Sequence, residues 1–270
     1  MPSEQPTGAV RASRALHGAL LAGASLAVVL LFLSSTAVSP SVQSATDRLP
    51  ALTGAPAQAP AVQLPPGADS PTYLANNNRD IFGPQEKLIN ASSAASLRLL
   101  WSFNQTGALE SEPVTSAGVV YVGSTSGYEY ALSTLTGQVL WQSYLGVDVN
   151  DTLCGTTALG IVSTPTVSGN TLLVFGGNAV LYDLNKESGK TLWQLALGNT
   201  SQGYFGWGSP LVIGADAFIG AASRCDKPLV PGGLYEVSLT THKEIAFFNT
   251  TSPGLVGNSI WSTPSYNPST

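Results

Sequence analysis

The chain is poor in charge, in histidine and in cysteine. Charged residues make up 10% of its 270 positions, against about a quarter in an ordinary soluble domain. This low content excludes a long charged helix, a coiled coil and a disordered acidic chain. Two histidines and two cysteines are too few for a Cys/His zinc site of the usual kind. The net charge is −5, with no basic cluster beyond Arg11 and Arg14, so we expect no nucleic-acid partner.

The longest uncharged apolar stretch lies near the N-terminus. Its most apolar part, residues 18–33, would be roughly 24 Å long as a helix, slightly short of a ~30 Å hydrocarbon core. Extended to residues 15–38, it is long enough to span a membrane. Because Arg11 and Arg14 precede it, we expect residues 1–14 to stay in the cytoplasm and the rest to be exported.

Two interpretations of this segment stay open. We favour an uncleaved signal anchor, which gives a single-pass protein in the cell membrane, because no cleavage site is clean. The other is a signal peptide cut near Ala37 or Ala45, which gives a secreted or periplasmic protein. Residues 39–72 are rich in Pro and Ala and cannot build a packed core, so we predict a disordered linker there.

Other features agree with export. Cys154 and Cys225 either form a disulfide in an oxidising compartment or stay as two separate buried thiols, and no spacing rule decides between these. The Asn-x-Ser/Thr pattern makes five asparagines candidate sites of N-glycosylation. They are Asn90, Asn104, Asn150, Asn199 and Asn249.

Beyond the linker the sequence repeats with a period of about 52 residues, and we look for such periods before anything else. Prolines preceded by Ser or Ser-x recur at positions 113, 165, 210 and 264. Further landmarks recur in the same order in each unit: Tyr130, Tyr182 and Tyr235; Thr136-Gly137, Ser188-Gly189 and Thr241-His242; Trp141 and Trp193. Phe247 or Phe248 lies near the third equivalent of the tryptophans.

Each unit divides into short β-branched or aromatic runs separated by turn residues, without a helical apolar stripe. We therefore predict an all-β fold, a β-propeller of four-stranded antiparallel blades over residues 73–270. About three to four blades fit, and the sequence stops within a blade, so we expect an N-terminal piece of a longer propeller. A β-sandwich is the alternative, but it needs no fixed period.

The repeated tryptophan and turn glycine have a structural explanation. A large ring at the end of a unit can cover the neighbouring blade and bury ~150–250 Å². The glycine that follows Thr or Ser permits a positive φ in the tight turn before the last strand.

These residues resemble a pyrroloquinoline quinone (PQQ)-type β-propeller repeat. The similar runs are LWSFNQTG (100–107), SEPV (111–114), GVVYVGS (118–124), GYEYAL (127–132) and TGQVLW (136–141). The superfamily includes PQQ-dependent alcohol dehydrogenases, polyvinyl-alcohol-dehydrogenase-like proteins and non-catalytic scaffold propellers. Residues 223–237 and 257–264 resemble the dehydrogenase-like branch more than the scaffold branch, and NNNR (76–79) is similar to the openings of such proteins.

The resemblance implies a site for PQQ and Ca²⁺. Trp261 lies in a segment similar to the one that supplies a tryptophan beneath the quinone, Trp207 is a second candidate for stacking, and Asn258 is the candidate metal ligand. The chain departs from the dehydrogenase pattern in two places: its cysteines are not adjacent, and Ile260 precedes Trp261 where the ligand asparagine is expected.

Two functions follow, and no catalytic residue is identified for either. The first is a membrane-tethered, extracytoplasmic scaffold that binds a protein or polymer with its loops, and we favour it because it requires no missing residue. The second is a PQQ-dependent alcohol or polyvinyl-alcohol dehydrogenase with the rest of its site in further blades. Three loop carboxylates are expected to be solvated: Asp148, Asp151 and Asp226.

Overall fold

The computed structural model describes residues 69–81, 83, 89–150 and 158–269. The predicted cytoplasmic segment 1–14, the predicted membrane segment 15–38 and most of the predicted linker lie outside this part. Within the described ranges, no helix has the length and apolar character needed to cross a membrane.

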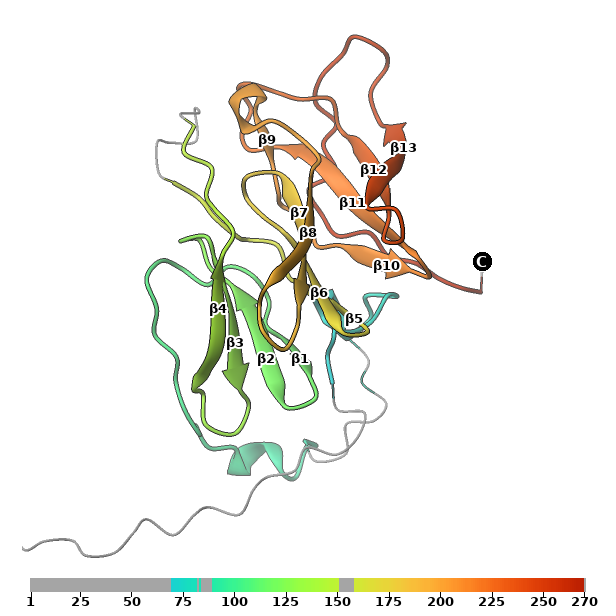
Figure 1. Ribbon diagram of the computed structural model, residues 1–270. Coiled ribbons are helices and arrows are strands. Elements are labelled where there is room, and N and C mark those ends of the chain that lie inside the picture. Colours follow the sequence, from blue (N-terminus) through green and yellow to red (C-terminus); the bar gives the residue numbers. More distant parts are fainter. Residues whose placement is uncertain (1–68, 82, 84–88, 151–157, 270) are drawn as a thin grey trace, which may run out of the picture. The chain divides into compact units, whose positions relative to one another are not determined.

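Three consecutive antiparallel sheets make up the fold (Figure 1). The first contains β1 (Val114–Ser116), β2 (Val119–Gly123), β3 (Tyr128–Ser133) and β4 (Val139–Tyr144). The second contains β5 (Thr166–Ser168), β6 (Thr171–Phe175), β7 (Val180–Asn185) and β8 (Thr191–Ala196). The third contains β10 (Leu211–Ile213), β11 (Asp216–Ser223), β12 (Gly233–Ser238) and β13 (Lys243–Asn249), with β9 (Tyr204–Phe205) paired to β11. The predicted all-β fold of four-stranded antiparallel sheets is confirmed.

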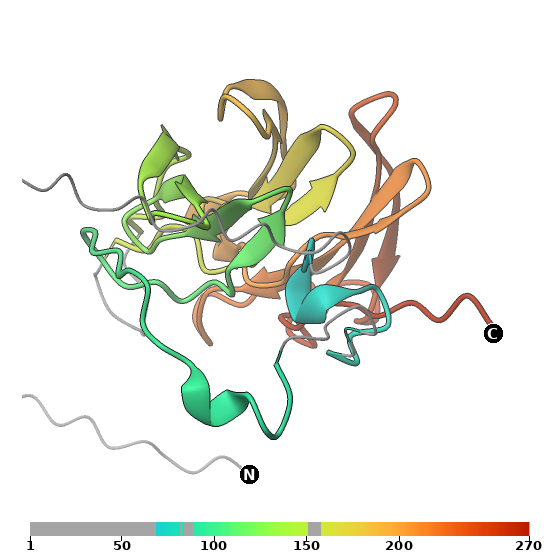
Figure 2. The ribbon, with the colours of Figure 1, turned by 90° about the horizontal axis from the view of Figure 1, so that it is seen from below.

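The three sheets are equivalent in detail. In each, the strands pair in chain order, and the third and fourth strands shift register once, at Ala131/Leu132, Asp183/Leu184 and Glu236/Val237. The first strands lie next to one another, because β5 contacts both β1 and β10. The sheets therefore meet along their first strands and fan out from there, as Figure 2 shows.

Apolar side chains fill the spaces between neighbouring sheets. The first and second sheets bury Tyr121, Leu172 and Val174 between them, and the second and third bury Phe175 and Ile219. Helical structure in the described part is limited to three short 3₁₀ turns: η1 (Tyr73–Ala75), η2 (Ala94–Ser96) and η3 (Thr200–Gln202).

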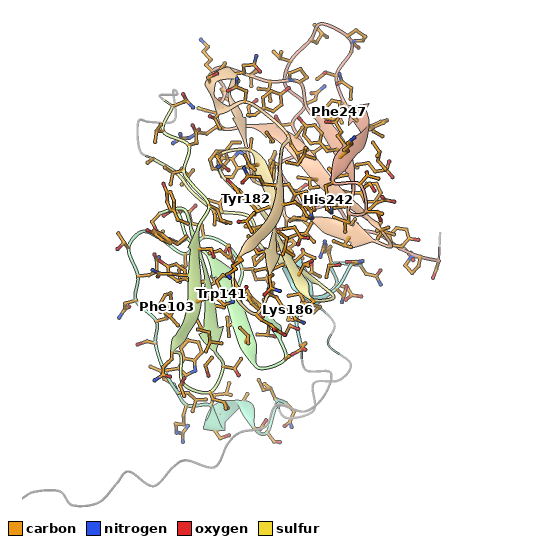
Figure 3. All side chains as sticks on the ribbon, viewed as in Figure 1. Phe103, Trp141, Tyr182, Lys186, His242 and Phe247 are labelled. Carbon is orange, nitrogen blue, oxygen red and sulfur yellow. The ribbon has the colours of Figure 1, made fainter. Side chains whose placement is uncertain are left out.

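The predicted contact of the outer-strand tryptophans with the next unit is confirmed. Trp141 on β4 lies against Gly189 of the second sheet, and its indole Nε1 donates to the carbonyl of Lys186 at 2.9 Å (Figure 3). Gly189 has φ +68°, as the turn requires. In the third sheet His242 replaces that glycine and stacks on Trp193, with ring centroids 4.8 Å apart.

Phe247 and Phe248 lie near the third equivalent of the tryptophans, as expected, and Ala246 occupies the equivalent position itself. Trp141 pairs with Ala131 and Trp193 with Asp183, and the equivalent Glu236 pairs with Ala246. The run Phe247-Phe248 lies one and two positions further along β13. Phe247 instead packs on Tyr235 within its own sheet, with centroids 4.7 Å apart.

Residues 69–79 form a strap across the first strands of the three sheets. The amide of Thr115 on β1 donates to the carbonyl of Ser70, and the amide of Val167 on β5 donates to that of Pro71. Asn77 Nδ2 donates to the carbonyl of Val212 on β10 at 2.8 Å. Residues 69–72, assigned to the linker from the sequence, therefore belong to the folded part.

Candidate functional site

The segments that enter each unit place equivalent residues around one axis. We align them on the four recurring prolines. The residue directly before these prolines is, in chain order, Glu112, Thr164, Ser209 and Thr263. The residue three positions before each proline is Glu110, Val162, Trp207 or Trp261.

A relay of hydrogen bonds links these segments. The amide of Glu112 donates to Thr164 Oγ1 at 3.0 Å, the amide of Thr164 to Ser209 Oγ at 2.8 Å, and the amide of Ser209 to Thr263 Oγ1 at 3.0 Å. Each unit thus holds the next through a side-chain oxygen at the same position. A hydroxyl suits this role because it accepts one bond and keeps a donor for another.

All eight of these residues line one cavity of about 560 Å³, here called the axial cavity. Its wall combines two indoles, two carboxylates and several hydroxyls. Arg79, from the strap, adds a guanidinium. Cavities of this volume with mixed apolar and polar walls are typical of ligand sites.

Arg79 is held by four bonds to backbone and side-chain oxygens. Nη1 donates to Thr72 Oγ1 and to the carbonyls of Tyr73 and Asn76, and Nε donates to the carbonyl of Pro264. Its Nη2 is buried and has no hydrogen-bond partner within the described residues. Burial lowers the pKa of this guanidinium, and the nearby Glu112 carboxylate opposes that effect.

A second cavity of about 640 Å³, here called the side cavity, adjoins the first. Trp207 and Trp261 line both. The indole Nε1 of Trp207 donates to the carbonyl of Ser223 at 2.9 Å, which fixes that ring. Trp261 is 68% exposed, so much of its ring is open to a ligand.

The side cavity brings several sequence-predicted residues together. Trp207, Trp261, Asn258 and Cys225 all line it. Cys225 is disulfide-bonded, and the chain's one other cysteine, Cys154, lies outside the described residues. The roles assigned to these residues remain predictions.

The expectation of a solvated Asp148 is wrong. Its carboxylate Oδ2 accepts from Arg224 Nη1 at 2.9 Å, with both side chains almost fully buried. Arg224 also lies over the ring of Phe205. Asp226 is exposed, as expected, and lines the side cavity, whereas Asp151 lies outside the described residues.

A quinone–calcium centre would need hard oxygen ligands at one point. Asn258 lines only the side cavity, whereas Glu110 and Glu112 line only the axial cavity. The Glu112 carboxylate already accepts from the amide of Leu74 at 3.2 Å. Within the described ranges, no cluster of three His, Cys, Asp or Glu side chains could hold a metal. The residues present therefore do not form the expected donor set.

Comparison with known proteins places the chain in a family. A PQQ-repeat family model described as "Outer membrane protein assembly factor BamB" matches residues 85–246, which is more than half of the chain. The chain belongs to this family. The PQQ-type repeat identified from the sequence is thereby confirmed.

Relatives in the PQQ-repeat family include enzymes and assembly factors. The chain is 26% identical over 164 residues to the quinoprotein alcohol dehydrogenase PedH of Pseudomonas putida, a match that covers 57% of this chain and 26% of PedH. It is 27% identical over 152 residues to outer membrane protein assembly factor BamB of Yersinia pestis, covering 52% of this chain and 36% of that protein. The chain thus spans well under half the length of each.

Solved structures establish the propeller-like fold. Quinohemoprotein alcohol dehydrogenase ADHIIG of Pseudomonas putida matches with a TM-score of 0.64 at 18% identity, covering 74% of this chain and 33% of that one. A europium-containing methanol dehydrogenase matches with a TM-score of 0.59 at 20% identity, covering 68% and 32%. At these identities the likeness concerns the fold alone.

Sequence reasoning missed three residues of the axial cavity, Arg79, Glu110 and Glu112. The signal for two of them was present, because the proline alignment extended by three positions upstream puts Glu110 level with Trp207 and Trp261. Arg79 belongs to the NNNR motif at 76–79, but the motif gave Arg79 no role, because this residue reaches the cavity only where the strap crosses the sheets.

Proposed function

We propose that these PQQ-type repeats act as a binding scaffold whose ligand enters where the axial and side cavities meet. The observation that carries this proposal is that Trp207 and Trp261, from successive units, line both cavities. An exposed indole gives apolar contact area at a small entropic cost, which is why aromatic residues concentrate in binding surfaces.

The ligand class that fits is a protein loop or an extended polymer segment. The two cavities together offer room for several residues of such a segment. Their rims supply hydrogen-bonding groups of both kinds, such as Asn258, Asp226 and Ser262. Binding of this type asks for no metal and no activated nucleophile.

We further propose that residues 15–38 anchor the scaffold in the cell membrane and that the repeats lie outside the cytoplasm. The basic residues before that segment support this orientation. The test is fractionation of cells that express the full chain, followed by protease treatment of intact cells or spheroplasts. Recovery of the chain in the membrane fraction with the repeats cleaved from outside is expected; a protected chain contradicts the proposal.

Site-directed photo-cross-linking tests the binding site. A photoreactive amino acid replaces Leu229, which lines the side cavity and is 40% exposed. The matched control places it at Leu140, which is 55% exposed on the outer strand β4. A discrete adduct from position 229, lost when Trp261→Ala is added and absent from position 140, is the expected result. Equal labelling from both positions contradicts the proposal.

A quinoprotein dehydrogenase is the second candidate, favoured by the similarity to PedH. Its test is dye-coupled oxidation of primary alcohols by the purified protein after loading with PQQ and Ca²⁺. Turnover that depends on both additions would favour the enzyme over the scaffold.

A further inference from the structure

The five Asn-x-Ser/Thr sites differ in what their side-chain amides do in the folded chain. We propose that Asn90, Asn199 and Asn249 are acceptors for N-linked glycans and that Asn150 is not. The proposal rests on the extracytoplasmic placement proposed above. The difference comes from the fold and not from the sequence pattern, because the same Asn-x-Ser/Thr pattern leaves the asparagine Nδ2 available at some sites and holds it in hydrogen bonds at Asn150.

At the three proposed acceptors, the asparagine and the hydroxyl residue form one turn, in which both residues are exposed at Asn90 and Asn199, whereas Thr251 beside the exposed Asn249 is buried. Ser201 donates to Asn199 Oδ1 from its amide at 2.9 Å and from its hydroxyl at 2.8 Å. Thr251 does the same to Asn249 Oδ1, at 2.8 Å and 2.6 Å. Ser92 donates to Asn90 Oδ1 at 3.0 Å and 2.6 Å.

In each turn only the oxygen of the asparagine side chain is used. The amide nitrogens of Asn90, Asn199 and Asn249 make no hydrogen bond with the described residues, and all three asparagines are exposed. Transfer of a glycan needs that nitrogen. The Nδ2–C1 bond forms while the bond between C1 and a lipid pyrophosphate breaks; the lipid pyrophosphate leaves with the electron pair of that bond, and the proton lost by the amide passes to the released pyrophosphate or to water.

Asn150 has the opposite arrangement. Its Nδ2 donates both of its hydrogens, to Asp148 Oδ1 at 2.6 Å and to Thr200 Oγ1 at 2.8 Å. Asp148 belongs to the buried ion pair with Arg224, and Arg224 Nη1 also donates to the carbonyl of Asn150 at 3.1 Å. A glycan at Nδ2 would remove one of these bonds and push a sugar into a half-buried site, at a cost to the fold.

The positions of two acceptors bear on the proposed binding site. Asn199 follows β8, and Asn249 ends β13, so each begins the connection that later contributes Trp207 or Trp261 to the cavities. Glycans there would stand at the outer ends of these connections. A ligand would then reach the cavities from the side of the first strands rather than past the ends of the fourth strands, β8 and β13.

The test has two arms, both with the full chain. In the first, the chain is expressed through the secretory pathway of yeast with a C-terminal Gly-Ser-Asn-Gly-Thr tag, and occupancy at each asparagine is measured by mass spectrometry after release with a peptide-N-glycosidase in ¹⁸O water, which converts each glycosylated Asn to ¹⁸O-labelled Asp. High occupancy at Asn90, Asn199 and Asn249, with little at Asn150, is expected. Each matched control, Ser92→Ala, Ser201→Ala or Thr251→Ala, should abolish occupancy at its own site alone.

In the second arm, unmodified chain purified from a host without the transferase is folded and then treated with a purified single-subunit oligosaccharyltransferase and a lipid-linked oligosaccharide. The same pattern of sites is expected. Occupancy of Asn150 comparable with the other sites in either arm overturns the proposal. A modified tag with unmodified native sites also overturns it while leaving the export proposal standing, whereas an unmodified tag in cells shows that the chain is not exported and removes its premise.

Discussion

The indole ring of Trp141 lies against Gly189, the turn glycine of the neighbouring sheet, and its Nε1 donates to Lys186 three residues earlier. A Cβ added at Gly189 would approach Trp141 Cε3 to 2.5 Å. Trp101 makes the same contact with Gly137, where an added Cβ would approach the ring to 2.6 Å. At these two turns the ring leaves no room for a Cβ, whereas at the third turn His242 stacks on the ring of Trp193 instead.

Gly189→Ala should therefore destabilise the fold for two reasons. The backbone has φ +68°, which costs about 1–2 kcal/mol for a residue with a side chain, and the new methyl group displaces Trp141. Gly169→Ala is the matched control, since Gly169 has φ +58° but nothing within 4 Å of an added Cβ. Urea unfolding should show a clearly larger loss for Gly189→Ala. Equal losses would mean that the ring contact adds nothing.

The buried Glu129 should make stability depend on pH. Its side chain is fully buried on β3, neither carboxylate oxygen has a hydrogen-bond partner among the described residues, and burial raises its pKa well above the ordinary value of 4.5. Because the folded-state pKa is the higher one, its contribution to stability is fully present below pH 4.5 and is lost as the pH rises toward the folded value.

Leu181 and Leu234 occupy the equivalent positions of the other two sheets. Glu129→Leu should raise the free energy of unfolding at pH 7 by on the order of 1–3 kcal/mol and flatten its pH profile. Glu244→Gln, an exposed change on β13, is the control and should alter neither. The measurement is urea unfolding from pH 4 to pH 8. An unchanged profile for Glu129→Leu contradicts the prediction.

Removing one partner of the Asp148–Arg224 pair should be costly. Arg224→Met leaves a buried carboxylate without its cation, for which we expect a loss of about 3–5 kcal/mol. Adding Asp148→Leu should restore part of that loss, because the uncompensated charge is then gone. Chemical denaturation of the two variants measures the difference, and a double variant no more stable than Arg224→Met would be inconsistent with an electrostatic origin.

The relay at the axis should be visible in amide exchange. Thr164→Val keeps the shape of a buried side chain but removes the oxygen that accepts from the amide of Glu112. We expect a loss of about 1–2 kcal/mol and faster hydrogen exchange of the Glu112 amide. Thr241→Val, at an exposed turn, is the control. Unchanged exchange at Glu112 would show that the relay does not hold the two units together.

The sequence by itself determined the repeat, the strands and the turn chemistry. The spacing of Tyr130, Tyr182 and Tyr235 marks equivalent third strands, and Gly137 and Gly189 take positive φ as their turns require, because strand alternation and turn conformation depend on neighbours along the chain.

The tertiary structure alone decided which side chains from different repeat units lie in contact. Asp148 was expected to be a solvated loop carboxylate, yet it forms a buried pair with Arg224, 76 residues away. Arg79 reaches the axial cavity because the strap crosses three sheets. Such contacts depend on how one sheet is set against another, and a periodic pattern carries no information about that.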